Sequence, residues 1–161
     1  MAVDMFLKIK PIDGESQDSK HKDEIEVLAW SWGMSQSGSM HAGTGGGAGK
    51  VSVQDLNFTH YIDKASADLM NACATGKHIP EATLVVRKAG GTEALEYLTV
   101  KLEDVIITGV HTGGSAGEDR LTENVTLNFA KVNFDYKQQT EKGASGAAPH
   151  FGYDIAANVA Q

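Results

Sequence analysis

Short apolar runs separated by polar, glycine-rich stretches make up most of this sequence, a pattern typical of a chain that folds mainly into β-strands. Two of the intervening stretches contain the turn-forming pairs Asp13-Gly14 and Gly90-Gly91. The runs expected to form strands are residues 5–10, 24–33, 51–61, 81–88, 92–102, 104–110, 121–136 and 151–159. The longest of these predicted strands is 121–136.

One segment departs from the strand pattern. Residues 63–74 (DKASADLMNACA) are rich in alanine and other good helix formers. Asp63 or Ser66 is available as the N-terminal cap, and Gly76 stands where a C-terminal cap would lie. We therefore expect one α-helix between the third and fourth strands.

Residues 35–50 (SQSGSMHAGTGGGAGK) contain so much glycine that we expect a long flexible loop without regular structure. The stretch ends in Gly49-Lys50, which invites comparison with a phosphate-binding loop. That motif requires Gly at position 44 and Ser or Thr at position 51, but the chain has Thr44 and Val51. A strand rather than a helix is expected to follow, so nucleotide binding is not supported.

The apolar face changes sides within three of the predicted strands. A strand of this kind must contain a bulge or pass from one packing partner to another. Strands that bend around a closed barrel would show this pattern, and so would strands whose second half faces another subunit. The changes separate Ile25 and Val27 from Leu28, Trp30 and Trp32; Val51 and Val53 from Leu56, Phe58 and Ile62; and Val125, Leu127 and Phe129 from Ala130, Val132, Phe134 and Tyr136.

Two strand faces consist of small or neutral polar side chains. Trp30 and Trp32 share a face that we expect to be core, although the pair could form a carbohydrate-stacking platform. If they point inward, the opposite face carries Ala29, Ser31 and Gly33, which suit a surface along which another molecule slides or lodges. A similar neutral face consists of Thr122, Asn124, Thr126 and Asn128. Solvent exposure and a functional wall both remain open as interpretations of these faces.

Composition limits the class of protein. The chain has 161 residues, of which 41% are hydrophobic, enough for the core of a single domain spanning residues 1–161. Its 21 acidic and 14 basic residues give a net charge of −7, which argues against a nucleic acid or an anionic membrane as partner. No apolar run approaches the ~20 residues that cross a bilayer. The start MAVDMFLKIK places lysines after the apolar stretch, so we expect synthesis in the cytoplasm without a cleavable signal peptide.

Catalytic and metal-binding patterns are weak. The single Cys73 excludes an internal disulfide and a multi-cysteine zinc site, and we expect it to be a small buried hydrophobe. The histidines lack metal-ligand spacing, so we expect solvated or singly hydrogen-bonded imidazoles: His21, His41, His60, His78, His111 and His150. We therefore predict no enzyme, no catalytic residues, no cofactor and no metal, and a hydrolase that uses Cys73 or a histidine is the least supported hypothesis.

Taken together and in order, these segments resemble the haemolysin-coregulated protein (Hcp) family, the tube subunits of bacterial type VI secretion systems. The resemblance covers nearly the whole chain and is most specific at residues 27–40 and 117–136. It rests on MAVDMFLKI, EIEVLAWSWGMSQSGSMH, GKVSVQDLNFTHYIDKAS, CATGKHIPEATLVVRKAGG, EYLTVKLEDVIITGV, TGGSAGEDRLTENVTLNFAKVNFDY and FGYDI.

The resemblance implies a compact, phage tail-tube-like β-barrel of two antiparallel sheets with one helix packed on its side and a long extended loop. It also implies homohexameric rings that stack into a hollow tube, which a contractile sheath expels with a spike at its tip. Small effector proteins would be held in the ring lumen, and the tube subunit would itself be secreted, outside the cell or into target cells. A small-ligand or carbohydrate-binding β-barrel that uses Trp30 and Trp32 is the alternative.

The resemblance also gives two sets of residues a role. Strand parity makes Ala29, Ser31 and Gly33 our candidates for the lumen wall that contacts effectors. The glycine-rich loop becomes an arm that contacts the next ring. Its candidate contact residues are Ser39, Met40, His41, Gly43, Gly45, Gly46, Gly47, Gly49 and Lys50.

Overall fold

The computed structural model describes residues 3–41, 43, 46–88, 94–140 and 146–161. In this part of the chain it contains ten strands and one helix. They are β1 (Val3–Lys8), β2 (Ile25–Ser31), β3 (Met34–Gly38), β4 (Ala48–Val53), β5 (Leu56–Tyr61), α1 (Ala65–Thr75), β6 (Ile79–Lys88), β7 (Leu95–Thr112), β8 (Thr122–Tyr136), β9 (His150–Asp154) and β10 (Val159–Ala160). The predicted Gly90-Gly91 turn lies outside the described residues.

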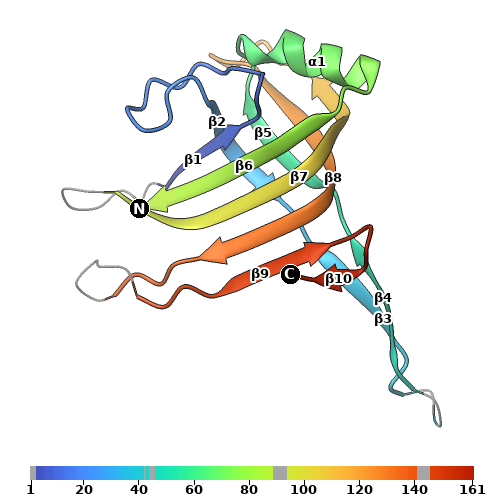
Figure 1. Cartoon of the computed structure of the whole chain (residues 1–161). Helices are drawn as coiled ribbons and strands as arrows, with labels where there is room; N and C mark the ends of the chain where they lie inside the picture. The colour runs from blue at the N-terminus through green and yellow to red at the C-terminus, as the bar shows by residue number, and fades with distance from the viewer. Residues whose placement is uncertain (1–2, 42, 44–45, 89–93, 141–145) are drawn as a thin grey trace.

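Six strands close into an antiparallel barrel. They follow one another in the order β8, β5, β2, β1, β6 and β7, and β7 pairs again with β8. The strands β9 and β10 extend the sheet from the second half of β8, and β3 and β4 form a separate two-stranded sheet. That hairpin projects from one end of the barrel, whereas α1 lies at the other end (Figure 1). The mainly β fold with one packed helix is confirmed.

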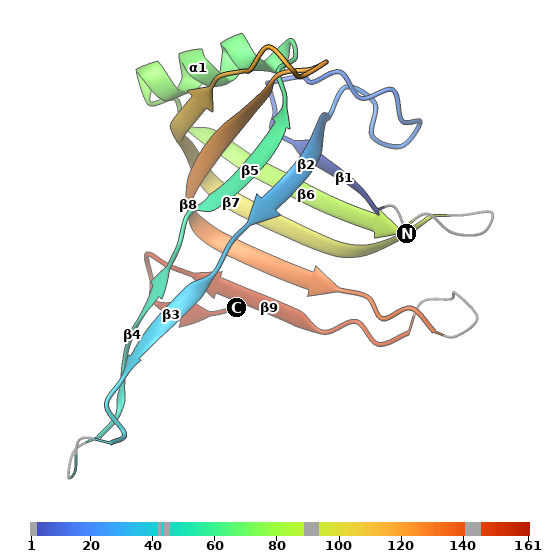
Figure 2. The ribbon, with the colours of Figure 1, turned by 180° about the vertical axis from the view of Figure 1, so that it is seen from behind.

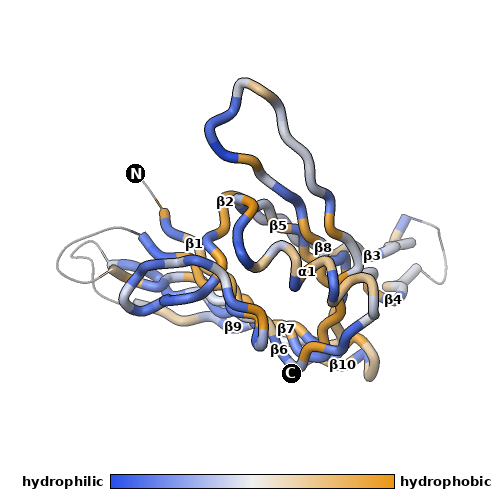
Figure 3. Tube along the Cα trace, turned by 90° about the horizontal axis from the view of Figure 1, so that it is seen from above, coloured by the Kyte–Doolittle hydropathy of each residue, from blue (hydrophilic) through white to orange (hydrophobic). Residues whose placement is uncertain are grey.

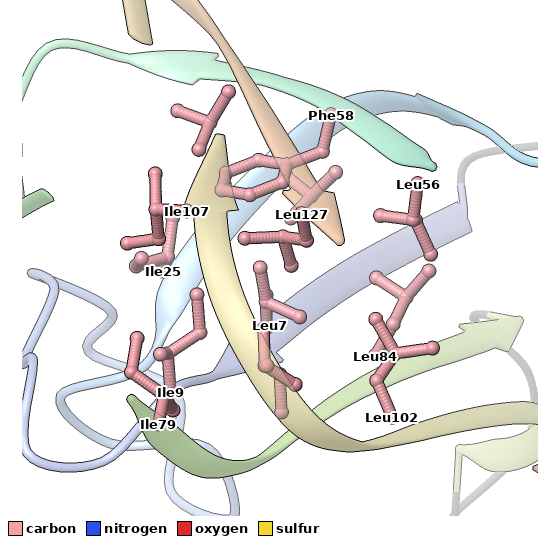
Figure 4. Close-up of a cluster of buried hydrophobic side chains, with 14 of the residues drawn as sticks. Leu7, Ile9, Ile25, Leu56, Phe58, Ile79, Leu84, Leu102, Ile107 and Leu127 are labelled. Carbon is pink, nitrogen blue, oxygen red and sulfur yellow. The ribbon is translucent and has the colours of Figure 1, made fainter. Parts of the chain in front are cut away.

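Apolar side chains from all six strands fill the barrel. Leu7, Ile25, Phe58 and Leu84, which come from four different strands, are each at most 1% exposed and gather in one cluster (Figure 4). Buried and more exposed positions alternate along barrel strands such as β5, β7 and β8, and Figure 3 shows hydrophobic and hydrophilic residues interspersed along the trace. Burial of this apolar surface is the main force that closes the barrel.

The predicted changes of apolar face coincide with irregularities in the strands. In β2 the register against β5 shifts between Val27 and Ala29, so Leu28 is an extra, exposed residue. In β7, Asp104 has a φ of 55°, and the buried positions change sides there. The buried positions of β8 change sides at Ala130. This residue lies between two β7–β8 pairs, Glu103 with Lys131 and Val105 with Phe129. Both long strands therefore bend at the same level of the barrel.

Several expectations about the elements were wrong. The glycine-rich loop is mostly the β3–β4 hairpin, because antiparallel pairing satisfies its backbone groups despite the glycine content. The apolar run 51–61 is divided between β4 and β5, and 151–159 forms the hairpin of β9 and β10. The two strands expected at 92–102 and 104–110 are one strand, β7, whose 18 residues exceed the 15 of β8. Ile62 is 38% exposed rather than part of the core.

The helix has the predicted C-terminal cap, whereas its N-cap position is Lys64, whose side chain makes no capping hydrogen bond. The predicted residues Asp63 and Ser66 lie on either side of that position. The Asp63 carboxylate accepts a hydrogen bond from the Ala65 amide (2.8 Å), and the Ser66 hydroxyl accepts one from the Asp63 amide (3.1 Å). These reciprocal bonds satisfy amide groups that the first turn leaves free. Gly76 ends the helix with a φ of 64°, and its amide bonds to carbonyls of the last turn. Cys73, expected to be buried, is only partly so.

Two histidines are more enclosed than the sequence predicts. His60 and Glu123 are both 0% exposed, and 2.7 Å separates His60 Nε2 from Glu123 Oε1. His21 stacks on Phe6 with ring centroids 4.5 Å apart and contacts the carboxylates of Glu24 and Glu96. His60, with one hydrogen bond, fits the expectation of a singly hydrogen-bonded imidazole, whereas His21, whose two ring nitrogens both contact carboxylates, does not. In both cases a carboxylate partner compensates for burial.

The loop that carries His21 is also held by an ion pair. Arg87 on β6 donates hydrogen bonds to both carboxylate oxygens of Asp18, one of them at 3.0 Å. The hydrogen-bonded guanidinium lowers the pKa of Asp18 to about 2. The loop between β1 and β2 is thus fixed to the outside of the barrel.

Candidate functional surface

The strands β2, β5 and β8 lie side by side (Figure 2), and opposite the core they present one continuous polar face. This face is formed by residues that alternate with buried ones along each strand, because successive side chains of a strand point to opposite sides of the sheet. We call this face the polar wall; it consists of Ala29, Ser31, Asn57, Thr59, Thr122, Asn124, Thr126 and Asn128. All eight side chains are exposed or half-buried.

Strand register arranges the wall in rows. Ser31 pairs with Asn57, which pairs with Thr126 on its other side. The next row contains Ala29, Thr59 and Asn124. Side chains within a row lie close enough to interact directly across the strands.

Hydrogen bonds join the side chains across the strands. The Thr59 hydroxyl donates to Asn124 Oδ1 at 2.6 Å, and the Thr126 hydroxyl donates to Asn57 Oδ1 at the same distance. At the end of the wall nearest the β3–β4 hairpin, Asn128 Nδ2 donates to Asp55 Oδ1 at 2.8 Å. These bonds hold the amides in fixed positions on the wall.

The wall carries no charged side chain, although 22% of all residues in the chain are charged. The half-buried carboxylate of Asp55, just before β5, lies opposite Asn128 at one end of the wall and accepts its hydrogen bond. The eight wall residues are therefore neutral and rich in hydrogen-bonding groups, and none of them is an acid or a base of the kind that active sites use.

The three residues predicted for the lumen wall lie in different surroundings. Ala29 and Ser31 are exposed on the polar wall, whereas Gly33 is half-buried just beyond β2, where an added Cβ would lie 3.5 Å from Gln54 Oε1. Trp30 and Trp32 pack against the core from the other side of the strand. Trp32 faces Phe134 and Phe151, at centroid distances of 6.4 and 6.5 Å, so the two tryptophans do not form an exposed stacking platform.

Residues Met34–Val53 form the arm, which consists of β3, β4 and the turn between them. Nearly all of its described side chains are exposed, and Met40 near the tip is 79% exposed. Gly46 is required there, because an added Cβ would lie 2.8 Å from the Ser39 carbonyl oxygen. The described candidates on the arm are Ser39, Met40, His41, Gly43, Gly46, Gly47, Gly49 and Lys50, and the candidate Gly45 lies outside the described residues.

The sheet that carries the wall has two edges that lack a strand partner in the described part of the chain. The strand β1 pairs with β2 only opposite Ile25 and Glu26, so the rest of β2 has one free edge. On the other side, β6 pairs with β7 only as far as Val105, so residues 106–112 of β7 have the second free edge. Free edges offer unpaired backbone donors and acceptors to another strand.

Sequence analysis missed Asn57 and Thr59 as members of the wall. The signal was present, because both residues alternate with Leu56, Phe58 and His60 along the strand. Only the pairing of β5 between β2 and β8 shows that their side chains join the two faces that the sequence did identify.

Neither a metal-binding group nor a membrane-spanning helix is found in the described residues. Histidine, cysteine and acidic side chains form no group that could hold a metal ion in the part of the chain that the structure describes. No helix in the same residues is long and apolar enough to cross a membrane.

The fold and the wall define a class of protein: a closed six-stranded β-barrel with a projecting hairpin, a neutral polar sheet face and, in the described residues, two free sheet edges. The family model described as "Type VI secretion system effector, Hcp" matches residues 6–136. A curated relative, Protein hcp1 of Pseudomonas aeruginosa, is 61% identical over 160 residues, which is 99% of each chain. This chain belongs to the Hcp family of type VI secretion proteins, and the resemblance found in the sequence is confirmed.

Solved structures agree with this assignment. Hcp1 from Salmonella typhimurium is 49% identical, covers 100% of both chains and superposes with a TM-score of 0.83. A type six secretion system protein that is 29% identical has a TM-score of 0.93 and covers 99% of this chain and 100% of its own. A type VI secretion system effector from Yersinia pestis is 43% identical, with a TM-score of 0.77 over 94% of this chain and 100% of its own. The family consists of secreted structural proteins, so this chain is not an enzyme.

Proposed function

We propose that this chain is the ring-forming subunit of a type VI secretion tube. Six copies close into a ring, rings stack into a hollow tube, and contraction of a surrounding sheath propels the tube with a spike protein at its tip. The observation that carries the proposal is the four-stranded sheet of β2, β5, β8 and the second half of β7, which has a free edge on each side.

The two edges suit a closed ring. The free edge of β7 in one copy meets the free edge of β2 in the next. Because the two edges belong to different strands, this contact is heterologous. Heterologous contacts generate rings when the rotation closes, and strand pairing would join the sheets of neighbouring copies. The polar walls of all copies would then line the central channel.

The wall and the arm take separate roles in this assembly. Ala29, Ser31 and Gly33 contact small effector proteins that the lumen carries, and the neutral face suits a surface past which a folded cargo moves. The arm, residues Met34–Val53, contacts the next ring through its exposed tip. The subunit leaves the cell through the secretion system, without binding nucleic acid or inserting into a membrane.

Gel filtration and negative-stain microscopy test the ring. A hexamer elutes near six times 17.1 kDa and shows a central hole. Ser31→Gln places a longer side chain on the wall, so we expect normal rings that retain less of the effector co-purified with wild-type protein. The exposed Ser19→Gln on the outer loop is the matched control. A monomer at high concentration would refute the proposal, and unchanged effector retention would remove Ser31 from the wall.

A further inference from the structure

We propose that Asn57 and Asn124 determine which cargo the polar wall binds, by donating side-chain amide hydrogen bonds to carbonyl oxygens on an uncharged surface of the cargo protein. This inference rests on the proposed function, because the cargo must reach the wall inside a ring. It assigns the role to two residues of β5 and β8 rather than to the strand that carries Ser31.

The directions of the hydrogen bonds support this choice. Thr59 donates to Oδ1 of Asn124, and Thr126 donates to Oδ1 of Asn57, both at 2.6 Å. An amide whose oxygen is already an acceptor presents its Nδ2 group, with two N–H donors, to the solvent side of the wall. In the described residues neither Nδ2 atom has a partner within the chain. Each asparagine thus offers two donors, and its Oδ1 keeps one of its two lone pairs.

Asn128 shows the contrast. Its Nδ2 donates to the carboxylate of Asp55 at 2.8 Å, and this bond uses one of its donors within the chain. The row of asparagines along the sheet is therefore not uniform. The donors available to a cargo lie in the two adjacent rows that contain Asn57 and Asn124.

The threonines also lower the entropic cost of binding. A free asparagine loses side-chain rotamer freedom when it binds, whereas these two amides are held in place by a neighbouring strand before any cargo arrives. Preorganised donors repeated in every copy of the ring would favour acceptors at regular spacing, such as main-chain carbonyls or the side chains of Gln, Asn and Ser.

The absence of charge on the wall predicts how binding responds to salt. Association between charged surfaces weakens as salt rises, because ions screen each charge over about 10 Å or less above 0.1 M. Hydrogen bonds between neutral groups lack this dependence. Cargo affinity should therefore change less than about threefold between about 50 and about 500 mM NaCl.

The test uses the protein that co-purifies with wild-type rings from the native bacterium, identified by mass spectrometry and then produced separately. Its dissociation constant is measured for rings of wild type, Asn57→Asp and Asn124→Asp. Each substitution keeps the side-chain shape but replaces both donors by an acceptor. We expect Kd to rise about tenfold for each variant, and to do so at both salt concentrations. Persistence at high salt separates loss of donors from added charge.

Two further sets of variants complete the design. Asn71→Asp makes the same chemical change on the exposed face of α1, away from the wall, and should leave Kd unchanged. Thr59→Val and Thr126→Val keep the amides but release them, so we expect a rise in Kd of about threefold. Normal affinity in the Asn57→Asp and Asn124→Asp rings would overturn this inference alone. Wild-type rings that carry no protein would overturn the cargo role in the proposed function, and this inference with it.

Discussion

The contact between His60 and Glu123 lies directly behind the polar wall. The two residues are opposite each other on β5 and β8, and their sequence neighbours Thr59 and Asn124 are also opposite each other on the wall. Both side chains are 0% exposed. A slip of one residue between the strands would turn one of the two groups to the opposite face and leave the other buried without its partner, which is costly. The buried pair therefore helps to fix the register on which the wall depends.

Replacing Glu123 by Ala should strongly destabilise the fold, because His60 then remains buried without its partner. We expect a loss of about 3–5 kcal/mol in the free energy of unfolding, measured by urea denaturation. The double variant His60→Leu/Glu123→Leu should lose much less, since no unpaired polar group remains. A single variant as stable as wild type would show that the pair contributes nothing.

The residue types on the wall could be predicted more easily than their contacts. Alternation with Val125 and Leu127 placed Asn124 and Thr126 on an outward face from the sequence alone. Their partners Asn57 and Thr59 lie more than 60 positions away in the chain. Local sequence carries no information about which distant strand will pair with which, so the hydrogen bonds of the wall could not be predicted.

Among the elements, α1 was the most predictable. The features that specify this helix act within a few residues of one another. They are its alanines, the hydrogen bonds of Asp63 and Ser66 at its start and the terminal Gly76. The β3–β4 hairpin was the least predictable, because its strands lie among glycines that have little intrinsic preference for the extended state. Pairing between the two strands, which is a property of the hairpin rather than of either strand, overrides that weakness.

Gly76→Ala should destabilise the protein by about 1 kcal/mol, because an L-residue is strained at a φ of 64°. The space around the position is open, so a steric clash does not contribute. Gly117→Ala is the matched control, since it also meets open space but does not have a positive φ. Thermal unfolding of the two variants measures the difference. Equal melting temperatures would mean that the left-handed cap contributes no stability.

Over the whole molecule, the acidic surface opposes the proposed assembly. Six copies that each carry −7 give a ring with a net charge of −42. Like charges repel when rings approach one another, and salt screens this repulsion over a Debye length of about 8 Å at physiological ionic strength. The stacking of rings into tubes should therefore depend on salt more strongly than the strand pairing that closes a ring does.

We expect rings to persist at moderate salt, while stacking into tubes weakens as the salt concentration falls. Sedimentation velocity across a salt series measures both species in one experiment. The control varies the protein concentration at one fixed, moderate salt concentration, which separates mass action from screening. Tubes that are most stable at the lowest salt would contradict this prediction.

Local pattern determined that this chain is mainly β, that it has one capped helix, that certain strands must bend, and that some strand faces are neutral and polar. These features depend on residues near one another in sequence, whose spacing fixes periodicity, capping and turn formation. The tertiary structure decided the order of strands around the barrel, the hairpin within the glycine-rich segment, the buried His60–Glu123 contact and the joining of three strands into one wall. Each of these depends on pairing between distant segments, and closure of the barrel around a shared core selects one pairing among many.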